Sequence, residues 1–303
     1  MEAEFYEWLR AHVPSHPRLP LGISDDAALL KQADSGDLVI TTDLLSDGVD
    51  FRLDRDDARR AGRKALAANL SDLAAMAARP VAATISIALP RECVGGRSSL
   101  ELAIALYEGL LPLAREFDVA VAGGDTNTHD GPTVISVTAF GETTRRGPLT
   151  RSGGQPGDVL LVTGSLGGSL AGHHFDFTPR VREALLLHER YDLHAGMDIS
   201  DGLSLDLARL ARASGCGAVI RGDLVPVSPA ARSLTDPLTH ALTDGEDFEL
   251  LLAVPPESAA SILNDRPLDC PITRIGELVP EPGLCLADAT GARTPLTPQG
   301  WQH

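Results

Sequence analysis

Short β-branched stretches alternate with long helical stretches in the first half of the chain, and this alternation limits the fold more than any other sequence feature. The expected strands cover 37–45, 84–89, 119–122 and 133–140, and the expected helices cover 56–78 and 98–117. Strands interleaved with long helices form layered α/β or α+β folds, in which helices cover a sheet. We therefore expect the N-terminal half to be a sheet with helices packed on it.

A segment rich in Gly, Pro and Arg, residues 145–157, separates this half from a second one. The second half repeats the mixture, with strands expected at 158–162, 218–221, 249–254 and 272–277 and a helix at 201–213. We place the domain boundary near Pro148, which gives domains 1–148 and 149–303. With 303 residues, each half is long enough to bury its own core.

Carboxylates stand at the ends of five expected elements. The five stretches are Ser24-Asp25-Asp26, Thr41-Thr42-Asp43, Asn69-Leu70-Ser71-Asp72, Gly123-Gly124-Asp125-Thr126 and Asp198-Ile199-Ser200-Asp201-Gly202. Magnesium prefers oxygen ligands and usually takes one or two protein carboxylates together with water and substrate phosphate. Several such turns meeting at one cleft could therefore hold more than one ion.

Each stretch also has a purely structural explanation, because Asp and Ser are common helix caps and turn residues. Asp72 fits that explanation least well. It lies beside apolar residues of an expected helix, where a carboxylate is costly unless it is paired or bound to a metal.

The net charge of -16, from 42 acidic and 26 basic residues, argues against nucleic acid as a partner, and no Lys/Arg-rich run offsets it. Nucleotides can still bind if divalent cations stand between carboxylates and phosphates. The chain has no Gly-x-x-x-x-Gly-Lys-Ser/Thr loop and only two lysines, Lys31 and Lys64. Metal ions and arginines are therefore expected to offset the phosphate charge.

The four cysteines show no Cys-x-x-Cys spacing, the N-terminus lacks a basic and apolar leader, and no apolar run approaches about 20 residues. A cytoplasmic location without a membrane span is expected. His173 and His174 are adjacent, so their side chains diverge and a metal site there is not favoured. Tyr107 lies on an amphipathic helix, where the pattern alone indicates a core residue.

Taken together and in order, six stretches resemble the thiamine-monophosphate kinase family, which shares a superfamily with aminoimidazole ribonucleotide synthetase and selenide water dikinase. They are Gly-Ile-Ser-Asp-Asp-Ala-Ala-Leu-Leu (22–30), Thr-Thr-Asp-Leu-Leu-Ser-Asp-Gly-Val-Asp-Phe (41–51), Ala-Asn-Leu-Ser-Asp-Leu-Ala-Ala-Met (68–76), Gly-Gly-Asp-Thr (123–126), Met-Asp-Ile-Ser-Asp-Gly-Leu (197–203) and Gly-Glu-Asp-Phe-Glu-Leu (245–250). The resemblance runs from Gly22 to Trp301, nearly the whole chain.

The resemblance implies a two-domain fold like that of aminoimidazole ribonucleotide synthetase. The N-terminal mixed sheet would pair across a homodimer into a barrel, the C-terminal domain would be an α/β sandwich, and nucleotide would lie between the domains. The implied activity is direct in-line transfer of phosphate from ATP to thiamine monophosphate, giving thiamine diphosphate. Several Mg²⁺ ions are implied, and a role for K⁺ is left open. Two alternatives stay open: an ATP-dependent synthetase of the same superfamily, and a catalytically silent nucleotide-binding protein.

The resemblance also implies site residues, carried over position by position. The implied magnesium ligands are Asp26, Thr41, Thr42, Asp43, Asp72, Asp125, Asp198 and Asp201, and Asp43, Asp72, Asp125 and Asp198 among them are implied to be catalytic. The implied nucleotide contacts are Tyr107, Gly124, Asp125, Arg151 and Ser200. The implied substrate contacts are Asp50, Glu246 and Trp301.

The chain departs from the family pattern at three places. Asp50 stands where a histidine is usual, Asp244 stands where a glycine is usual, and the segment 173–180 is abbreviated. A negative charge at position 50 opposes binding of an anionic phosphate unless a cation offsets it.

Overall fold

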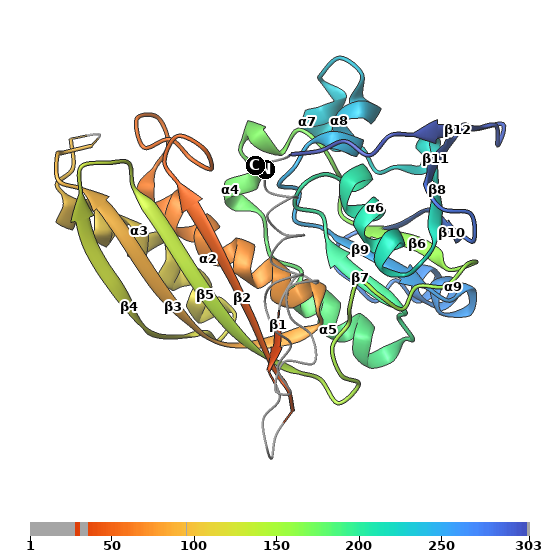
Figure 1. Cartoon of the computed structure of the whole chain (residues 1–303), viewed down its shortest axis with the longest axis horizontal. Coiled ribbons are helices and arrows are strands. Elements are labelled where there is room, and N and C mark those ends of the chain that lie inside the picture. Colours follow the sequence, from red (N-terminus) through yellow and green to blue (C-terminus); the bar gives the residue numbers. More distant parts are fainter. Residues whose placement is uncertain (1–27, 31–35, 95, 302–303) are drawn as a thin grey trace, which may run out of the picture.

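The computed structural model describes residues 28–30, 36–94 and 96–301, and these residues form two lobes that are each built on a β-sheet (Figure 1). Within the described residues, the N-terminal sheet has the strand order β1-β2-β5-β3-β4 and the C-terminal sheet has the order β12-β11-β8-β10-β6-β9-β7. Both sheets are mixed, since β3 and β4 run parallel, as do β8 and β11, among otherwise antiparallel pairs. The expected two-domain α/β fold with a mixed N-terminal sheet is confirmed, and the C-terminal sheet is mixed as well.

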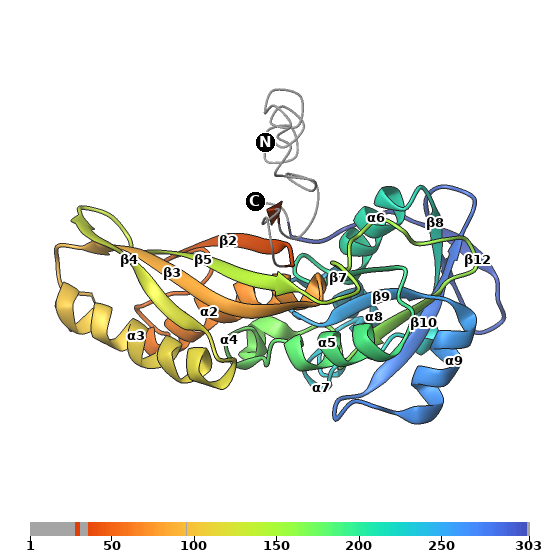
Figure 2. The ribbon, with the colours of Figure 1, turned by 90° about the horizontal axis from the view of Figure 1, so that it is seen from below.

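Two helices cover one face of the N-terminal sheet (Figure 2). The elements of this lobe are β1 (Ala28–Leu30), β2 (Leu38–Ser46), α2 (Ala58–Ala75), β3 (Ala78–Pro90), α3 (Ser99–Glu116), β4 (Ala120–His129) and β5 (Val134–Thr143). Side chains fix both helix starts. Asp57 accepts a hydrogen bond from the Arg59 amide, and Ser98 and Glu101 form a reciprocal capping box.

The C-terminal lobe buries both faces of its strands β6, β7 and β9. Its elements are β6 (Val159–Thr163), α4 (His173–Asp176), α5 (Val181–Arg190), β7 (Ala195–Asp198), α6 (Leu203–Ala213), β8 (Gly217–Arg221), α7 (Pro229–Arg232), α8 (Pro237–Thr243), β9 (Leu250–Val254), α9 (Pro256–Asp265), β10 (Ile272–Val279), β11 (Leu284–Ala287) and β12 (Arg293–Leu296). Successive strand residues point to opposite faces. Accordingly, Val159 and Leu161 join one hydrophobic core, whereas Leu160 and Val162 join the other.

One of these cores runs through both lobes. It contains Leu66 and Leu73 of α2 together with Phe175, Leu187 and Leu252 of the C-terminal lobe. Helix α2 packs against α4, α5 and β7 as well as against its own sheet. The two lobes are therefore joined by a shared apolar interior as well as by the linker between β5 and β6.

The Gly-Gly-Asp-Thr stretch, expected as a turn after a short strand, lies instead inside β4. The pairing of β3 with β4 shifts between Ala83 and Thr84, which leaves Ala122 as an extra residue in the outer strand. A Cβ atom on Gly124 would lie 1.7 Å from the Ile85 carbonyl oxygen, so only glycine allows this approach. The glycines therefore let the strand continue through a bulge.

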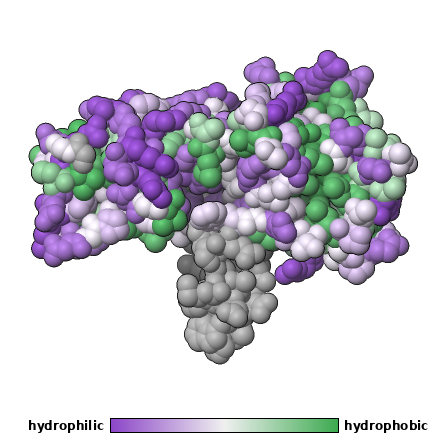
Figure 3. Space-filling view, turned by 90° about the horizontal axis from the view of Figure 1, so that it is seen from above, coloured by the Kyte–Doolittle hydropathy of each residue, from purple (hydrophilic) through white to green (hydrophobic). Residues whose placement is uncertain are grey.

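The surface mixes residue types on the side shown in Figure 3, where hydrophilic residues are interspersed with hydrophobic ones over both lobes. Among the described helices, none has both the length and the apolar character required to cross a bilayer.

Helices α2 and α3 touch backbone to backbone. A Cβ atom on Gly62 would lie 2.0 Å from the Leu106 carbonyl oxygen, and one on Gly109 would lie 1.7 Å from the Arg59 carbonyl oxygen. Two glycines on facing helices thus set the distance between them.

We expect Gly109→Ala to lower the free energy of unfolding by about 1–3 kcal/mol, because the added methyl group forces the helices apart. The intrinsic helix preference of Ala acts in the opposite direction by about 1 kcal/mol, so a net loss identifies the packing effect. Urea denaturation measures it, with exposed Glu108→Ala as the control, expected within about 0.5 kcal/mol of wild type. A more stable Gly109→Ala protein would contradict the close approach.

Candidate active site

Two carboxylates, one from each lobe, are bonded beside the last turn of α2, which lies next to the middle of β2 and the carboxyl end of β7. The Thr41 hydroxyl on β2 donates a hydrogen bond to the Asp72 carboxylate near the end of α2. The neighbouring Ser71 hydroxyl donates to Asp198 Oδ2 at 2.6 Å, and both residues are buried. Helix α2 therefore places one carboxylate beside β2 and holds another at the carboxyl end of β7.

Asp43 lies on β2 two residues after Thr41 and carries an unsatisfied oxygen. Its Oδ2 atom is buried and has no hydrogen-bond partner among the described residues. Burial, with a further contribution from the charge of Asp50, raises the pKa of the Asp43 carboxyl from 3.8 to about 6. An orphaned carboxylate oxygen near other oxygen donors suits a hard cation. Thr42 is exposed on the opposite face of β2, and its hydroxyl donates to the Val137 carbonyl at 3.1 Å.

The carboxylates are paired rather than gathered into one cluster. In the described part of the chain, no three His, Cys, Asp or Glu side chains form a group able to hold a metal ion by themselves. Asp26 lies outside the described residues. Magnesium needs only one or two protein carboxylates when phosphate and water complete its shell, so paired carboxylates remain suitable ligands.

A second group lies on the C-terminal side, around the turn that follows β7. The Glu246 amide donates to the Ser200 carbonyl at 2.6 Å, and the Trp301 amide donates to the Asp201 carbonyl at 2.8 Å. The Trp301 side chain is half exposed. Glu246 has a φ of +63°, an uncommon conformation for a residue other than glycine. The structure thus brings Ser200, Asp201, Glu246 and Trp301 together, although they come from three distant parts of the sequence.

The Asp201 carboxylate is held in an ion pair. Arg209 Nη1 lies 2.5 Å from Asp201 and 2.8 Å from Asp206. Burial, followed by the nearby charge of Asp201, raises the pKa of Asp206 to about 7, and Arg209 and Arg151 oppose this shift. Arg151, from the linker, therefore lies close enough to act electrostatically on this acidic pair.

Asp50 and Glu246 are both connected to Lys64, which is almost completely buried. The Asp50 carboxylate caps its own turn by accepting a hydrogen bond from the Ser46 amide at 2.7 Å, while its carbonyl accepts one from Lys64 at 2.8 Å. Glu246 pairs with Lys64 at 2.5 Å and with His174 at 3.1 Å. Burial works against the charge of Glu246, but the bonds from His174 and Lys64 keep its pKa below the ordinary value.

Tyr107, Gly124 and Asp125 lie away from both groups. Asp43 pairs with Val137 on β5, Val137 with Ile85 on β3, and Ile85 with Gly124 on β4. Three strand spacings of about 4.8 Å separate β2 from β4, so Asp125 is about 14 Å across the sheet from Asp43. Tyr107 is half-buried on α3 against the shared core, as its helical pattern indicated.

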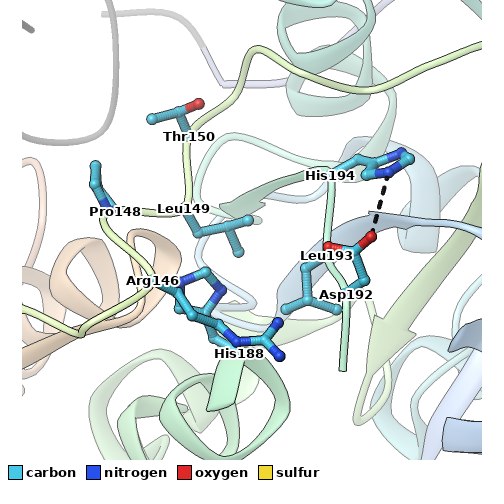
Figure 4. A pocket seen from close by; sticks show the side chains of 8 residues that line it. All are labelled: Arg146, Pro148, Leu149, Thr150, His188, Asp192, Leu193 and His194. Atoms are coloured by element: carbon cyan, nitrogen blue, oxygen red, sulfur yellow. Dashed lines mark ion pairs between the residues drawn. The ribbon is translucent and has the colours of Figure 1, made fainter. Parts of the chain in front are cut away.

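A cavity of about 330 Å³ lies beside the linker, but it does not coincide with these groups (Figure 4). It is lined by Arg146, Pro148, Leu149, Thr150, His188, Asp192, Leu193 and His194. Several of its polar groups already have partners: Arg146 donates to the Tyr191 carbonyl at 2.7 Å, and His194 lies 2.9 Å from Asp158. No residue that the sequence singled out for catalysis or binding lines this cavity.

Sequence reasoning missed Lys64, Ser71, His174, Asp206 and Arg209. A signal existed for Lys64, which interrupts the apolar side of a helix, where an unpaired charge is costly. For His174 the sequence offers only its adjacency to His173, which does not indicate a partner 110 residues away. Asp244, one of the departures from the family pattern, accepts a hydrogen bond from the Gly168 amide at 2.7 Å and so fixes the glycine-rich loop after β6.

We expect Asp43→Asn to stabilise the metal-free protein increasingly as the pH rises from about 4 through 6. The wild-type carboxyl has a raised pKa in the folded state, so its ionisation destabilises the fold over that range, by up to about 3 kcal/mol. Urea denaturation in a chelator at pH 4.5 and 7.5 measures the difference. Exposed Asp54→Asn is the control, and a difference that does not change with pH would refute the assignment.

Comparison with known proteins covers both lobes. Residues 24–143 match the family model of the AIR synthase related protein N-terminal domain, and residues 155–287 match that of the C-terminal domain. The thiamine-monophosphate kinase of Rhodopirellula baltica is 42% identical over 315 residues, covering 100% of this chain and 97% of that protein. The enzyme of Escherichia coli K12 is 33% identical over 99% of this chain and 96% of its own length.

Solved structures give the same result. AaThiL complexed with AMPPCP and TMP superposes with a TM-score of 0.82 at 27% identity, covering 100% of this chain and 95% of that one. Thiamine-monophosphate kinase from Stenotrophomonas maltophilia K279a gives a TM-score of 0.74 at 35% identity, covering 94% and 96%. The chain therefore belongs to the thiamine-monophosphate kinase family.

Proposed function

We propose that this chain transfers the terminal phosphate of ATP to thiamine monophosphate, with Mg²⁺ as cofactor, to form thiamine diphosphate and ADP. The observation that carries the proposal is that adjacent residues of α2 bond both lobes: Asp72 accepts from Thr41 on β2, and Ser71 donates to Asp198 on β7. Asp43, two residues after Thr41, has a buried oxygen without a hydrogen-bond partner among the described residues. Full-length similarity to thiamine-monophosphate kinases supports the choice of substrate. The domain limits 1–148 and 149–303 are part of the proposal, as is a cytoplasmic location, in keeping with four free cysteines.

The site residues suit a reaction between two anions. A phosphate monoester has a second pKa of about 6, so the attacking oxygen is already ionised near neutral pH and no general base is needed. The bond between the terminal phosphorus and the bridging oxygen of ATP breaks as the new phosphorus–oxygen bond forms, and ADP carries away the electron pair. The protein must therefore align the two phosphates and offset their charge.

We assign the metal-binding role to the implied carboxylates and hydroxyls. Asp43, Asp72 and Asp198 would hold Mg²⁺ at the lobe junction with Thr41, and bound Mg²⁺ would supply positive charge between the phosphates. Thr42, whose side chain lies on the opposite face of β2, would serve a separate site. Asp26, Asp125 and Asp201 would complete further sites. K⁺ is not needed for this scheme.

We assign substrate contacts to Glu246, Trp301 and the turn at Asp50, and nucleotide contacts to Tyr107, Gly124, Asp125, Arg151 and Ser200. The proximity of Asp50 to Asp43 means that a cation bound by Asp43 would also offset the charge at position 50. The added negative charge therefore need not exclude a phosphate.

The test is product analysis with thiamine monophosphate, thiamine and other monophosphates. A thiamine-monophosphate kinase gives ADP and thiamine diphosphate. Thiamine monophosphate should therefore be the one acceptor among these compounds. A synthetase of the same superfamily would give ADP and free phosphate, and a silent nucleotide-binding protein would give no ADP. Either of these outcomes would refute the proposal.

We expect Asp72→Asn to abolish turnover while the protein stays folded, because a metal ligand is lost and carboxylate repulsion is relieved. Initial rates at saturating ATP and thiamine monophosphate measure turnover, and the melting temperature checks folding. Exposed Asp118→Asn serves as the matched control with wild-type activity. An Asp72→Asn protein with more than about a tenth of wild-type turnover would contradict the metal role.

We also propose a homodimer in which the uncovered face of the N-terminal sheet pairs into a shared barrel. Helices α2 and α3 cover the other face, whereas Leu44 on β2 is 67% exposed and Val81 on β3 is 37% exposed. Apolar side chains left in water on a sheet face favour association.

We expect Leu44→Glu to convert the dimer to a monomer, because the partner sheet would bury its charge. Light scattering coupled to gel filtration measures the mass. Leu100→Glu, on the outer side of α3, where the leucine is 70% exposed, makes the same exchange and should leave the mass unchanged. A monomeric wild-type protein, or a dimeric Leu44→Glu protein, would count against this interface.

A further inference from the structure

Lys64 is the buried cation of this structure that most needs an explanation. It lies in the middle of α2, and only 1% of its side chain is exposed. Burying an ammonium group is costly unless it is paired and hydrogen-bonded. Lys64 Nζ lies 2.8 Å from the Asp50 carbonyl, 2.5 Å from Glu246 Oε1 and 3.0 Å from His174 Nδ1. The Glu246 carboxylate balances its charge and the Asp50 carbonyl accepts a second hydrogen bond, while His174 Nδ1, when it carries a proton, donates to Glu246 Oε2 at 3.1 Å.

The three partners come from three separate segments. Asp50 closes the turn after β2, His174 belongs to the short helix α4, and Glu246 lies in the turn before β9. The first belongs to the N-terminal lobe and the other two to the C-terminal lobe. One ammonium group therefore joins the turn at position 50 to the turn at position 246, and both turns carry proposed substrate contacts.

The backbone does not fix the Glu246 carboxylate by itself. The Glu246 amide is anchored on the Ser200 carbonyl, while the carboxylate reaches the opposite way, to Lys64 and His174. Without those two partners the side chain, which is 25% exposed, would lose its ion pairs with Lys64 and His174. The position of the carboxylate therefore depends on α2 and α4.

Helix α2 also holds α4 in place. Arg60 pairs with Asp176 at 2.5 Å, and Arg63 donates to the Phe175 and Phe177 carbonyls at 2.8 and 2.6 Å. Residues 60, 63 and 64 lie on one side of a helix. This basic side of α2 fixes the segment that carries His174, so the imidazole reaches Glu246 from a supported position.

We propose that Lys64 and His174 are positioning residues for the proposed substrate contacts: they hold the Glu246 carboxylate and tie it to the turn at Asp50. The inference rests on the proposed function, because it assumes that Glu246 contacts thiamine monophosphate. It adds that α2 supplies metal ligands at its end and, two turns earlier, determines the geometry of the substrate contact.

The test is a double-mutant cycle on Lys64 and Glu246, with KM measured separately for thiamine monophosphate and for ATP. We expect Lys64→Met and Glu246→Gln each to raise KM for thiamine monophosphate at least 10-fold, with KM for ATP within 2-fold of wild type. KM of the double variant for thiamine monophosphate should be no higher than that of Glu246→Gln alone, because Lys64 acts through Glu246. If the fold-increases in KM caused by the two single substitutions multiplied in the double variant, the two residues would act independently and the proposal would be overturned.

Two further variants keep the test decisive. Lys64→Met leaves Glu246 without its cation and could fail to fold, so His174→Gln is measured as well. It should raise KM for thiamine monophosphate several-fold in the wild-type background and have no effect in the Glu246→Gln background. Arg59→Gln removes a charge from the same helix, but Arg59 pairs with Glu108 on α3 and should leave both KM values unchanged.

The outcomes separate this inference from the proposed function. A wild-type protein that does not phosphorylate thiamine monophosphate refutes both. The wild-type protein could be active and Glu246→Gln could raise KM for thiamine monophosphate, while Lys64→Met and His174→Gln both leave that KM unchanged. In that case the positioning role alone is wrong. A loss of thermal stability with unchanged KM values would likewise show that the network is only structural.

Discussion

A carboxylate removed from water must find a hydrogen bond, an ion partner or a proton, and the region between the lobes is organised around this requirement. A threonine and a serine hydroxyl each donate to one oxygen of Asp72 and of Asp198, and Arg209 forms an ion pair with Asp201. Lys64 and His174 meet this requirement for Glu246. Asp43 remains with a buried, unsatisfied oxygen among the described residues and a pKa raised by burial. A cation is the partner that would satisfy it.

Most of the fold could be predicted because the relevant signals are local. The β-branched run expected at 37–45 forms β2 from Leu38 to Ser46, and the helix expected at 98–117 runs from Ser99 to Glu116, where Ser98 caps it. Hydrophobic periodicity and capping act within a few residues, so a single sequence contains them. The bulge in β4 depends on how close β3 lies, which explains why the Gly-Gly-Asp-Thr stretch was expected as a turn.

The candidate site was predictable in kind but not in arrangement. Sequence patterns singled out the acidic stretches, and family resemblance assigned roles to them. Neither could show that Asp201 is paired with Arg209, that Asp50 caps its own turn, or that Asp125 lies three strands from Asp43. These facts depend on contacts between distant segments. Lys64 and His174 are 110 residues apart, and no local pattern indicates their hydrogen bond.

The apolar interior shared by the two lobes restricts how the enzyme can move. Leucines of α2 pack in the same core as Phe175 and Leu252, so swinging one lobe away from the other as a rigid body would expose that core to water. Ligands must then gain access by rearrangement of loops and side chains at the surface between the lobes, and not by a hinge motion of one lobe. The same continuity should make the lobes unfold as one cooperative unit, despite the two sheets.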